Sequence, residues 1–365
     1  MNFDFSEDQK LLQKTARDYL EEHCGLDVCR DVLESGGTHS EALWKGVAEM
    51  GWLGAAVPED FGGAGFGRLE LSLIALELGR ALAPIPFAPS VYLATEALLE
   101  FGSDAQKKKW LPRLASGELI ATFALAERPG RAGLAGVETT LARNTITGTK
   151  FPVPDGQLAG LAVVVVRGEA GPALALVELD ASGVETTPID SIDPSRPQSR
   201  IVFQGAAAEP LAKGIGTAAV SHLLDRAAVL TAFEQIGGAE RALEATREFT
   251  LGRYAFGRPV ASFQAIKHRL ADLYAAIQLA TSNAYYGAWA LSTGDAELGT
   301  AACGARISAS EAFNLAGEEI IQMHGGVGYT WEYDCHLFYR RAKLLSLCLG
   351  SPGEWRDALI DRLEA

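Results

Sequence analysis

Cysteine is scarce in this chain of 365 residues, and acidic residues outnumber basic ones. The five cysteines are odd in number and show no paired Cys-x-x-Cys spacing, which argues against a disulfide framework or a zinc site. We therefore expect no metal. Lysine and arginine total 32 against 46 aspartates and glutamates, and the basic residues are scattered. The formal charge of −14 argues against nucleic acid or an anionic membrane as a partner.

Long apolar runs are also absent. No stretch of about 18 uninterrupted apolar residues occurs, so no transmembrane helix is expected. The first residues, MNFDFSEDQK, are acidic and show no apolar core typical of a signal peptide. We expect a cytoplasmic protein. Hydrophobic residues make up 48% of the chain, and its length predicts two or three packed regions.

Helical and strand patterns divide the chain into three predicted domains. Residues 1–117 show helical periodicity, with capping-box spacing at Ser6 with Gln9 and at Ser103 with Gln106. Residues 118–212 contain short β-favouring runs broken by Gly, Pro and Asp, which predict a small antiparallel barrel or sandwich.

Residues 213–365 return to helical periodicity and predict an antiparallel helical bundle. Its three long helices are expected over residues 214–252, with a possible break at Gly237 and Gly238, over 262–291 and over 297–323. A fourth helical segment should follow Pro352. The predicted fold class is therefore α+β.

A glycine cluster closes the third long helical pattern. Gly325, Gly326 and Gly328 follow Gln322, and the missing side chains would let backbone N–H groups approach an anionic or planar ligand closely. A helix C-cap followed by a tight connection explains the same glycines without a ligand.

A second stretch, RYAFGRPVASFQ from Arg253 to Gln264, lies between the first two long helices. Together with the glycine cluster and the order of the three regions, it resembles the acyl-CoA dehydrogenase family over essentially the whole chain. The runs DFSEDQKLLQKTARDYL, GSDAQKKKWLPRLASGE and RRAK fit the same family. The resemblance implies FAD as cofactor and an acyl-CoA thioester as substrate.

In that family these two C-terminal motifs reach across a subunit interface to the partner's FAD. Carried over by position, Arg253 would pair with the pyrophosphate, Phe256 would pack near the adenosine, and Gln264 would hydrogen-bond the cofactor. Gln322, Gly325 and Gly326 would add side-chain and backbone contacts. An arginine fork suits phosphate oxygens. Without a cofactor, Arg253 would be a helix-end residue, Phe256 a core residue and Gln264 a polar helix start.

The family's catalytic base, a glutamate that removes the α-proton, has no counterpart at either of its usual positions. Leu349 occupies the first position, just before Gly350, and Ala227 occupies the alternative one on the first long C-terminal helix. Neither side chain can accept a proton. Glu234 is the remaining candidate, but seven residues of helix displace it by about 10 Å from Ala227.

Two segments that surround the flavin ring in the family also differ here. Residues 126–129 (AERP) stand in place of a Thr-Glu-Pro-Gly segment, and residues 152–155 (PVPD) in place of a Trp-Ile-Thr segment. The substitutions remove two hydroxyl donors and one aromatic wall, and proline donates no N–H. The dinucleotide half of an FAD site is thus retained while the ring-facing half is altered.

These differences suggest one subunit of a heteromeric dehydrogenase, resembling the base-lacking subunit of the α2β2 enzymes of actinobacterial steroid side-chain breakdown. Its partners would be a second acyl-CoA dehydrogenase subunit, an acyl-CoA substrate and an electron-transferring flavoprotein. A homomeric dehydrogenase with a non-standard base such as Glu234 is one alternative. A non-redox acyl-CoA binding or scaffold protein is another. The acyl group cannot be read from the sequence.

Overall fold

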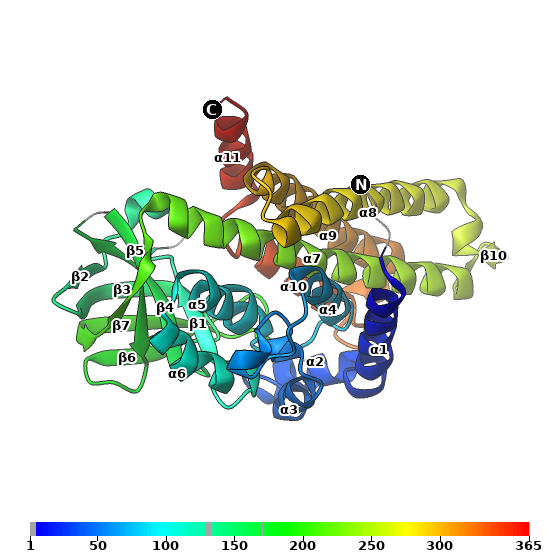
Figure 1. Cartoon of the computed structure of the whole chain (residues 1–365). Coiled ribbons are helices and arrows are strands. Elements are labelled where there is room, and N and C mark those ends of the chain that lie inside the picture. Colours follow the sequence, from blue (N-terminus) through cyan, green and yellow to red (C-terminus); the bar gives the residue numbers. More distant parts are fainter. Residues whose placement is uncertain (1–4, 129–132, 170, 365) are drawn as a thin grey trace.

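A computed structural model describes residues 5–128, 133–169 and 171–364 of the chain. It confirms the predicted fold class: a helical N-terminal part, a middle sheet and a C-terminal helical bundle. Figure 1 shows the sheet on one side and the long helices extending away from it. None of the helices in these ranges is long and apolar enough to cross a membrane.

The N-terminal part packs short helices around a shared apolar core. Both predicted capping boxes are confirmed, because the hydroxyls of Ser6 and Ser103 accept hydrogen bonds from the backbones of Gln9 and Gln106. A π-helical segment, η3, follows Pro86 and Phe87. The elements are α1 (Glu7–His23), α2 (Leu26–Ser35), α3 (Glu41–Glu49), η1 (Trp52–Gly54), η2 (Glu59–Phe61), α4 (Arg68–Arg80), η3 (Ala88–Thr95), α5 (Glu96–Phe101) and α6 (Asp104–Ala115).

The middle part is an eight-stranded sheet in the order β6-β7-β3-β2-β4-β5-β8, with β1 paired to β4. Most neighbours are antiparallel, but β4 pairs in parallel with both β1 and β2. Four consecutive valines, 163–166, give β4 a run that is buried on both faces. The strands are β1 (Ala121–Ala124), β2 (Thr140–Ala142), β3 (Thr145–Pro154), β4 (Leu161–Gly168), β5 (Gly171–Glu178), β6 (Val184–Ile189), β7 (Gln198–Ala207) and β8 (Glu209–Ile215).

The C-terminal part is a bundle of long antiparallel helices. Figure 1 shows α7 running from the sheet to the small β9–β10 hairpin at the opposite end of the molecule. The elements are α7 (Thr217–Gly252), β9 (Tyr254–Ala255), β10 (Arg258–Pro259), η5 (Val260–Ser262), α8 (Gln264–Thr293), α9 (Leu298–His324), η6 (Gly325–Tyr329), α10 (Cys335–Leu347) and α11 (Pro352–Glu364).

The predicted break at Gly237 and Gly238 is wrong, because α7 is continuous through both residues. These glycines serve helix packing instead. A Cβ atom on Gly237 would lie 1.9 Å from the carbonyl oxygen of Leu76 on α4, and one on Gly79 would lie equally close to the carbonyl of Glu234. The missing side chains therefore let α4 and α7 approach backbone to backbone.

Candidate functional site

The two predicted dinucleotide motifs lie at the same end of the helical bundle. Phe249, four residues before Arg253, stacks on His324 with ring centroids 4.0 Å apart. Arg269, near the start of α8, forms a two-pronged ion pair with Glu319 near the end of α9, with both N–O distances 2.7 Å. These contacts bring the hairpin after α7 beside the glycine turn after α9.

All six predicted cofactor-binding residues are exposed in the single chain. Phe256 is 95% exposed and has a positive φ of 53°, which is uncommon for a bulky residue. It therefore does not belong to the core. The Arg253 side chain forms no ion pair or hydrogen bond with the described residues, so its guanidinium is available to a ligand or partner. The others are Gln264, Gln322, Gly325 and Gly326.

The three glycines of the turn, Gly325, Gly326 and Gly328, differ in why a glycine is needed at each position. Gly325 ends α9 with φ 65° and its N–H donates to Gln322, as in a helix C-cap. A Cβ on Gly328 would lie 2.5 Å from the carbonyl oxygen of Ile321, so packing requires that glycine. Gly326 has neither a positive φ nor a neighbour within 4 Å of an added Cβ. Nothing within the described chain explains why Gly326 lacks a side chain.

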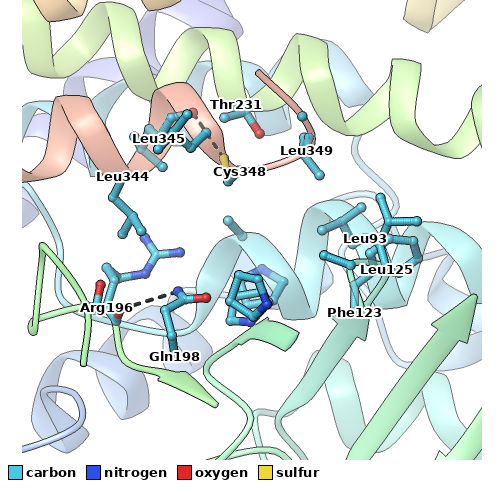
Figure 2. A pocket seen from close by; sticks show the side chains of 18 of the residues that line it. Leu93, Phe123, Leu125, Arg196, Gln198, Thr231, Leu344, Leu345, Cys348 and Leu349 are labelled. Atoms are coloured by element: carbon cyan, nitrogen blue, oxygen red, sulfur yellow. Dashed lines mark hydrogen bonds between the residues drawn. The ribbon is translucent and has the colours of Figure 1, made fainter. Parts of the chain in front are cut away.

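A cavity of about 460 Å³ lies beside Thr231, near the middle of α7, where the bundle meets the sheet. Its walls come from η3, β1, β3, the residues before β7, α7 and the segment 344–354. Figure 2 shows Leu93, Phe123 and Leu125 grouped on one wall and Arg196 beside Gln198 on the other. Most of the lining is apolar, as is typical of pockets for small molecules.

Both predicted base positions carry side chains that cannot accept a proton. Leu349 lines the cavity with φ 64°, an uncommon conformation for leucine, and its carbonyl accepts a hydrogen bond from the indole of Trp355. Ala227 is fully buried on α7, and its carbonyl accepts the Thr231 hydroxyl at 2.8 Å. The cavity thus has no carboxylate at either position.

Glu234 is engaged in a buried ion pair. It is 4% exposed, and its Oε1 accepts a hydrogen bond from Arg196 Nη1 at 3.2 Å. Arg196 Nε lies 3.7 Å from Asp155, which is also buried. Burial raises the pKa of Asp155 to about 6, and the nearby arginines offset this only in part. Glu234 would have to leave Arg196 before it could act as a base.

The two altered ring-facing segments are held by contacts within the chain. Glu127 accepts hydrogen bonds from the Thr139 amide and from Lys150 Nζ, both at 2.8 Å. Burial lowers the pKa of Lys150 to about 8, although Glu127 acts in the opposite direction. Pro152 follows a cis peptide bond. Of the segment 126–129, Pro129 lies outside the described residues.

Sequence reasoning missed a group of buried polar residues around Arg196, of which Tyr92 and Arg196 line the cavity. Tyr92, Asp155, Arg196 and Ser199 come from η3, the turn after β3, the loop before β7 and β7 itself. No spacing in the sequence joins these residues. The position of Asp155 at the end of the altered segment 152–155 was the only available signal, and it did not indicate the contact with Arg196.

Comparison with known proteins identifies relatives that align over nearly the full chain. The N-terminal domain model of acyl-CoA dehydrogenases matches residues 6–118, and the C-terminal domain model matches residues 214–363. Acyl-CoA dehydrogenase IpdE2 of Mycobacterium tuberculosis is 33% identical over 98% of this chain and 97% of its own length.

Two solved heteromeric structures are similar as well. A chain from a variant of the Tcur3481-Tcur3483 steroid ACAD is 30% identical with a TM-score of 0.89 over 98% of both chains. A chain of the ChsE4-ChsE5 complex from Mycobacterium tuberculosis is 28% identical with a TM-score of 0.91, covering 100% of this chain and 99% of that one. The chain therefore belongs to the acyl-CoA dehydrogenase family of oxidoreductases.

Proposed function

We propose that this chain is the base-lacking subunit of a heteromeric acyl-CoA dehydrogenase, and that it completes the FAD site of its partner. The single observation that carries the proposal is a division within the chain. The exposed dinucleotide motifs follow the C-terminal end of α7. The cavity lies beside Thr231, near the middle of the same helix, and has no carboxylate at either usual base position, although Asp190 and Glu354 line it elsewhere.

The distance between the motifs and the cavity supports a cofactor that is shared between two chains. Thr231 lines the cavity and Arg253 begins the exposed motif, so 22 residues of helix separate them, or about 33 Å of rise. The exposed motif would therefore act on a cofactor whose ring lies in another chain.

The outer face of α8 supports a partner at this position. Tyr274 is 56% exposed and Leu279 is 68% exposed, and Ala271, Ala275 and Tyr286 are exposed on the same helical face. A run of exposed apolar side chains on one long helix is typical of a protein–protein contact. The face continues directly from Gln264, so a subunit that covers α8 would also approach the dinucleotide motifs.

In the proposed complex, each chain has a separate task. FAD would accept the hydride that leaves the β-carbon of the acyl thioester. Arg253 would hold the negative charge of the pyrophosphate through charge-assisted hydrogen bonds. The missing side chains at Gly325 and Gly326 would let the backbone of the turn approach the cofactor without steric hindrance. The partner would supply the ring pocket and the carboxylate that removes the α-proton.

The substrate proposed for the complex is a CoA thioester with a steroid-derived acyl group. This proposal is supported by similarity to the steroid ACAD heteromer, at 30% identity over nearly all of both chains. An electron-transferring flavoprotein is the proposed acceptor of electrons from the reduced flavin.

Co-expression with a dehydrogenase partner tests the proposal. The purified chain alone should carry no stoichiometric flavin, and the complex should carry one flavin for each pair of unlike chains. A yellow single chain whose flavin is reduced by an acyl-CoA would establish the homomeric alternative, with Glu234 released from Arg196. If no mixture of chains retains flavin, the non-redox scaffold alternative is supported instead.

A further inference from the structure

The end of the molecule that carries the exposed motifs is fixed by contacts within the single chain. The Arg253 amide donates to the Phe249 carbonyl, and the Arg253 carbonyl accepts from the Val260 amide, each at 2.8 Å. Phe256 meets Phe263 edge to face, with ring centroids 6.3 Å apart. These contacts hold the β9–β10 hairpin, and the ring stack at the end of α7 joins it to the glycine turn. The surface is therefore formed before any partner binds.

Three basic side chains at this end lack a carboxylate partner. Arg253 precedes β9, Arg258 begins β10 and Lys267 lies in the first turn of α8, and none of them forms an ion pair with the described residues. The Arg258 guanidinium lies 3.9 Å from the centroid of the Phe263 ring, which limits its movement. In a chain with a formal charge of −14, such a local group of unpaired cations favours an anionic ligand. Arginine forks suit phosphate oxygens in particular.

His324 adds a hydrogen-bond acceptor beside the glycine turn. Its Nδ1 lies 2.6 Å from the Ile320 carbonyl oxygen, and because a carbonyl only accepts, Nδ1 carries the proton of the neutral ring. Burial lowers the pKa of His324, so the ring is neutral at pH 7. Nε2 forms no hydrogen bond with the described residues and can accept one from a hydroxyl or amino group. Ionised phosphate oxygens only accept, so Nε2 suits a nucleoside and not its phosphates.

We infer that the free chain binds a nucleoside diphosphate at this end without its partner. The phosphates lie against Arg253, Arg258 and Lys267. The base stacks on the exposed ring of Phe256, and a hydroxyl or amino group of the nucleoside donates to His324 Nε2. The inference rests on the proposed function, because that function assigns these motifs to a dinucleotide. It goes further by making this chain a preformed half-site that can bring the cofactor into the complex.

Calorimetric titration of the flavin-free full chain with ADP, adenosine and inorganic diphosphate tests the inference. ADP should bind one site with a Kd of about 0.01–1 mM, the range of a few solvent-exposed contacts and too weak to survive purification. It should bind at least tenfold more tightly than adenosine or inorganic diphosphate, since each of these offers only part of the contacts. Absence of ADP binding would overturn the inference. Equal binding of inorganic diphosphate would also overturn it, because the site would then recognise only an anion.

An arginine variant locates the phosphates. Arg253→Ala should weaken ADP binding at least fivefold, because the phosphates lose a charged partner. The matched control is Arg167→Ala, which removes another exposed arginine, on β4, and should leave ADP binding unchanged. If both variants bind ADP as the unaltered chain does, the phosphates do not lie at the hairpin and the assignment fails.

A histidine variant locates the nucleoside. His324→Phe keeps a ring against Phe249 but removes Nε2, so it should weaken ADP binding about two- to tenfold, the range of one hydrogen bond, and leave the binding of inorganic diphosphate unchanged. His222→Phe is the control, because His222 lies on α7 about 40 Å of helix rise away from Phe249. A His324→Phe variant that weakens both ligands equally, or neither, would contradict the contact with the nucleoside.

The result is separable from a failure of the proposed function. The flavin content of the complex is measured with the same preparation of the chain. A complex that holds flavin while the free chain ignores ADP would refute only the half-site. A free chain that carries its own reducible flavin would refute the proposed function, whatever the titration shows.

Discussion

Asparagine in place of Asp155 should stabilise the folded protein at neutral pH, because it removes a buried charge that has no hydrogen bond. Asp155 is 1% exposed, and neither carboxylate oxygen accepts a hydrogen bond from the described residues. The nearby Arg196 is already paired with Glu234. Asparagine is isosteric with aspartate and tolerates the left-handed backbone at this position, where φ is 51°.

The magnitude follows from the shifted pKa. Burial raises the pKa of Asp155 from 3.8 to about 6. The folded state therefore binds the proton more tightly than the unfolded state, and stability falls as pH rises from about 4 to about 6. A shift of about 2 units at about 1.4 kcal/mol each gives a loss of about 3 kcal/mol. Asp155→Asn should show no advantage near pH 4 and its full advantage above about pH 7.

Thermal unfolding across pH 4.5 to 8 measures this difference, and Asp193→Asn is the matched control. Asp193 is also buried, but Arg341 Nε and the Ser195 hydroxyl both donate to it at 2.6 Å. Burial acts to raise its pKa, yet these partners outweigh it and the pKa is lowered. Asp193→Asn should therefore destabilise at neutral pH. A less stable Asp155→Asn variant at pH 7.5, or a pH-independent difference, would refute the reasoning.

Three further predictions concern the cofactor motif, the base position and helix packing. Arg253→Ala should weaken the binding of FAD to the complex by about 1–3 kcal/mol, the value of a charged hydrogen bond. The control is Arg167→Ala, which removes another exposed arginine and should leave FAD binding unchanged. Equal flavin occupancy in the two variants would contradict the assignment. Leu349→Glu should not give the single chain flavin or activity, because the ring-facing segments remain altered; a yellow, active variant would disprove this. Gly237→Ala should lower the free energy of unfolding by about 1–3 kcal/mol or more, because the added Cβ clashes with α4. In the control variant Gly304→Ala the added Cβ meets no neighbour within 4 Å, so the free energy of unfolding should rise by up to about 1 kcal/mol. Chemical denaturation that ranks these two variants the other way would refute the packing argument.

Local signals in the sequence predicted much of the fold. The pairs Ser6 with Gln9 and Ser103 with Gln106 were sufficient to locate two helix starts, because a capping box uses only residues three apart. The long helices were also predictable from their periodicity. The order of the strands was not predictable, since the partner of a strand is not encoded within the strand itself.

A cofactor site could be proposed from the sequence only where the family's motifs are contiguous. The exposed stretch from Arg253 to Gln264 and the glycine turn are short continuous segments, so a resemblance could identify them. The continuity of α7 at Gly237 was not predictable, because it depends on the backbone of α4, which lies far away in the sequence. The buried polar group of Tyr92, Asp155, Arg196 and Ser199 was not predictable for the same reason, because its residues come from separate segments that meet only after folding.

Flavin stoichiometry tests the central claim most directly. The chain should be purified alone and with its dehydrogenase partner, and FAD should be quantified against each polypeptide. The account predicts no stoichiometric FAD on the chain alone and one FAD for each pair of unlike chains in the complex. One FAD on every chain, reducible by an acyl-CoA without the partner, would contradict it.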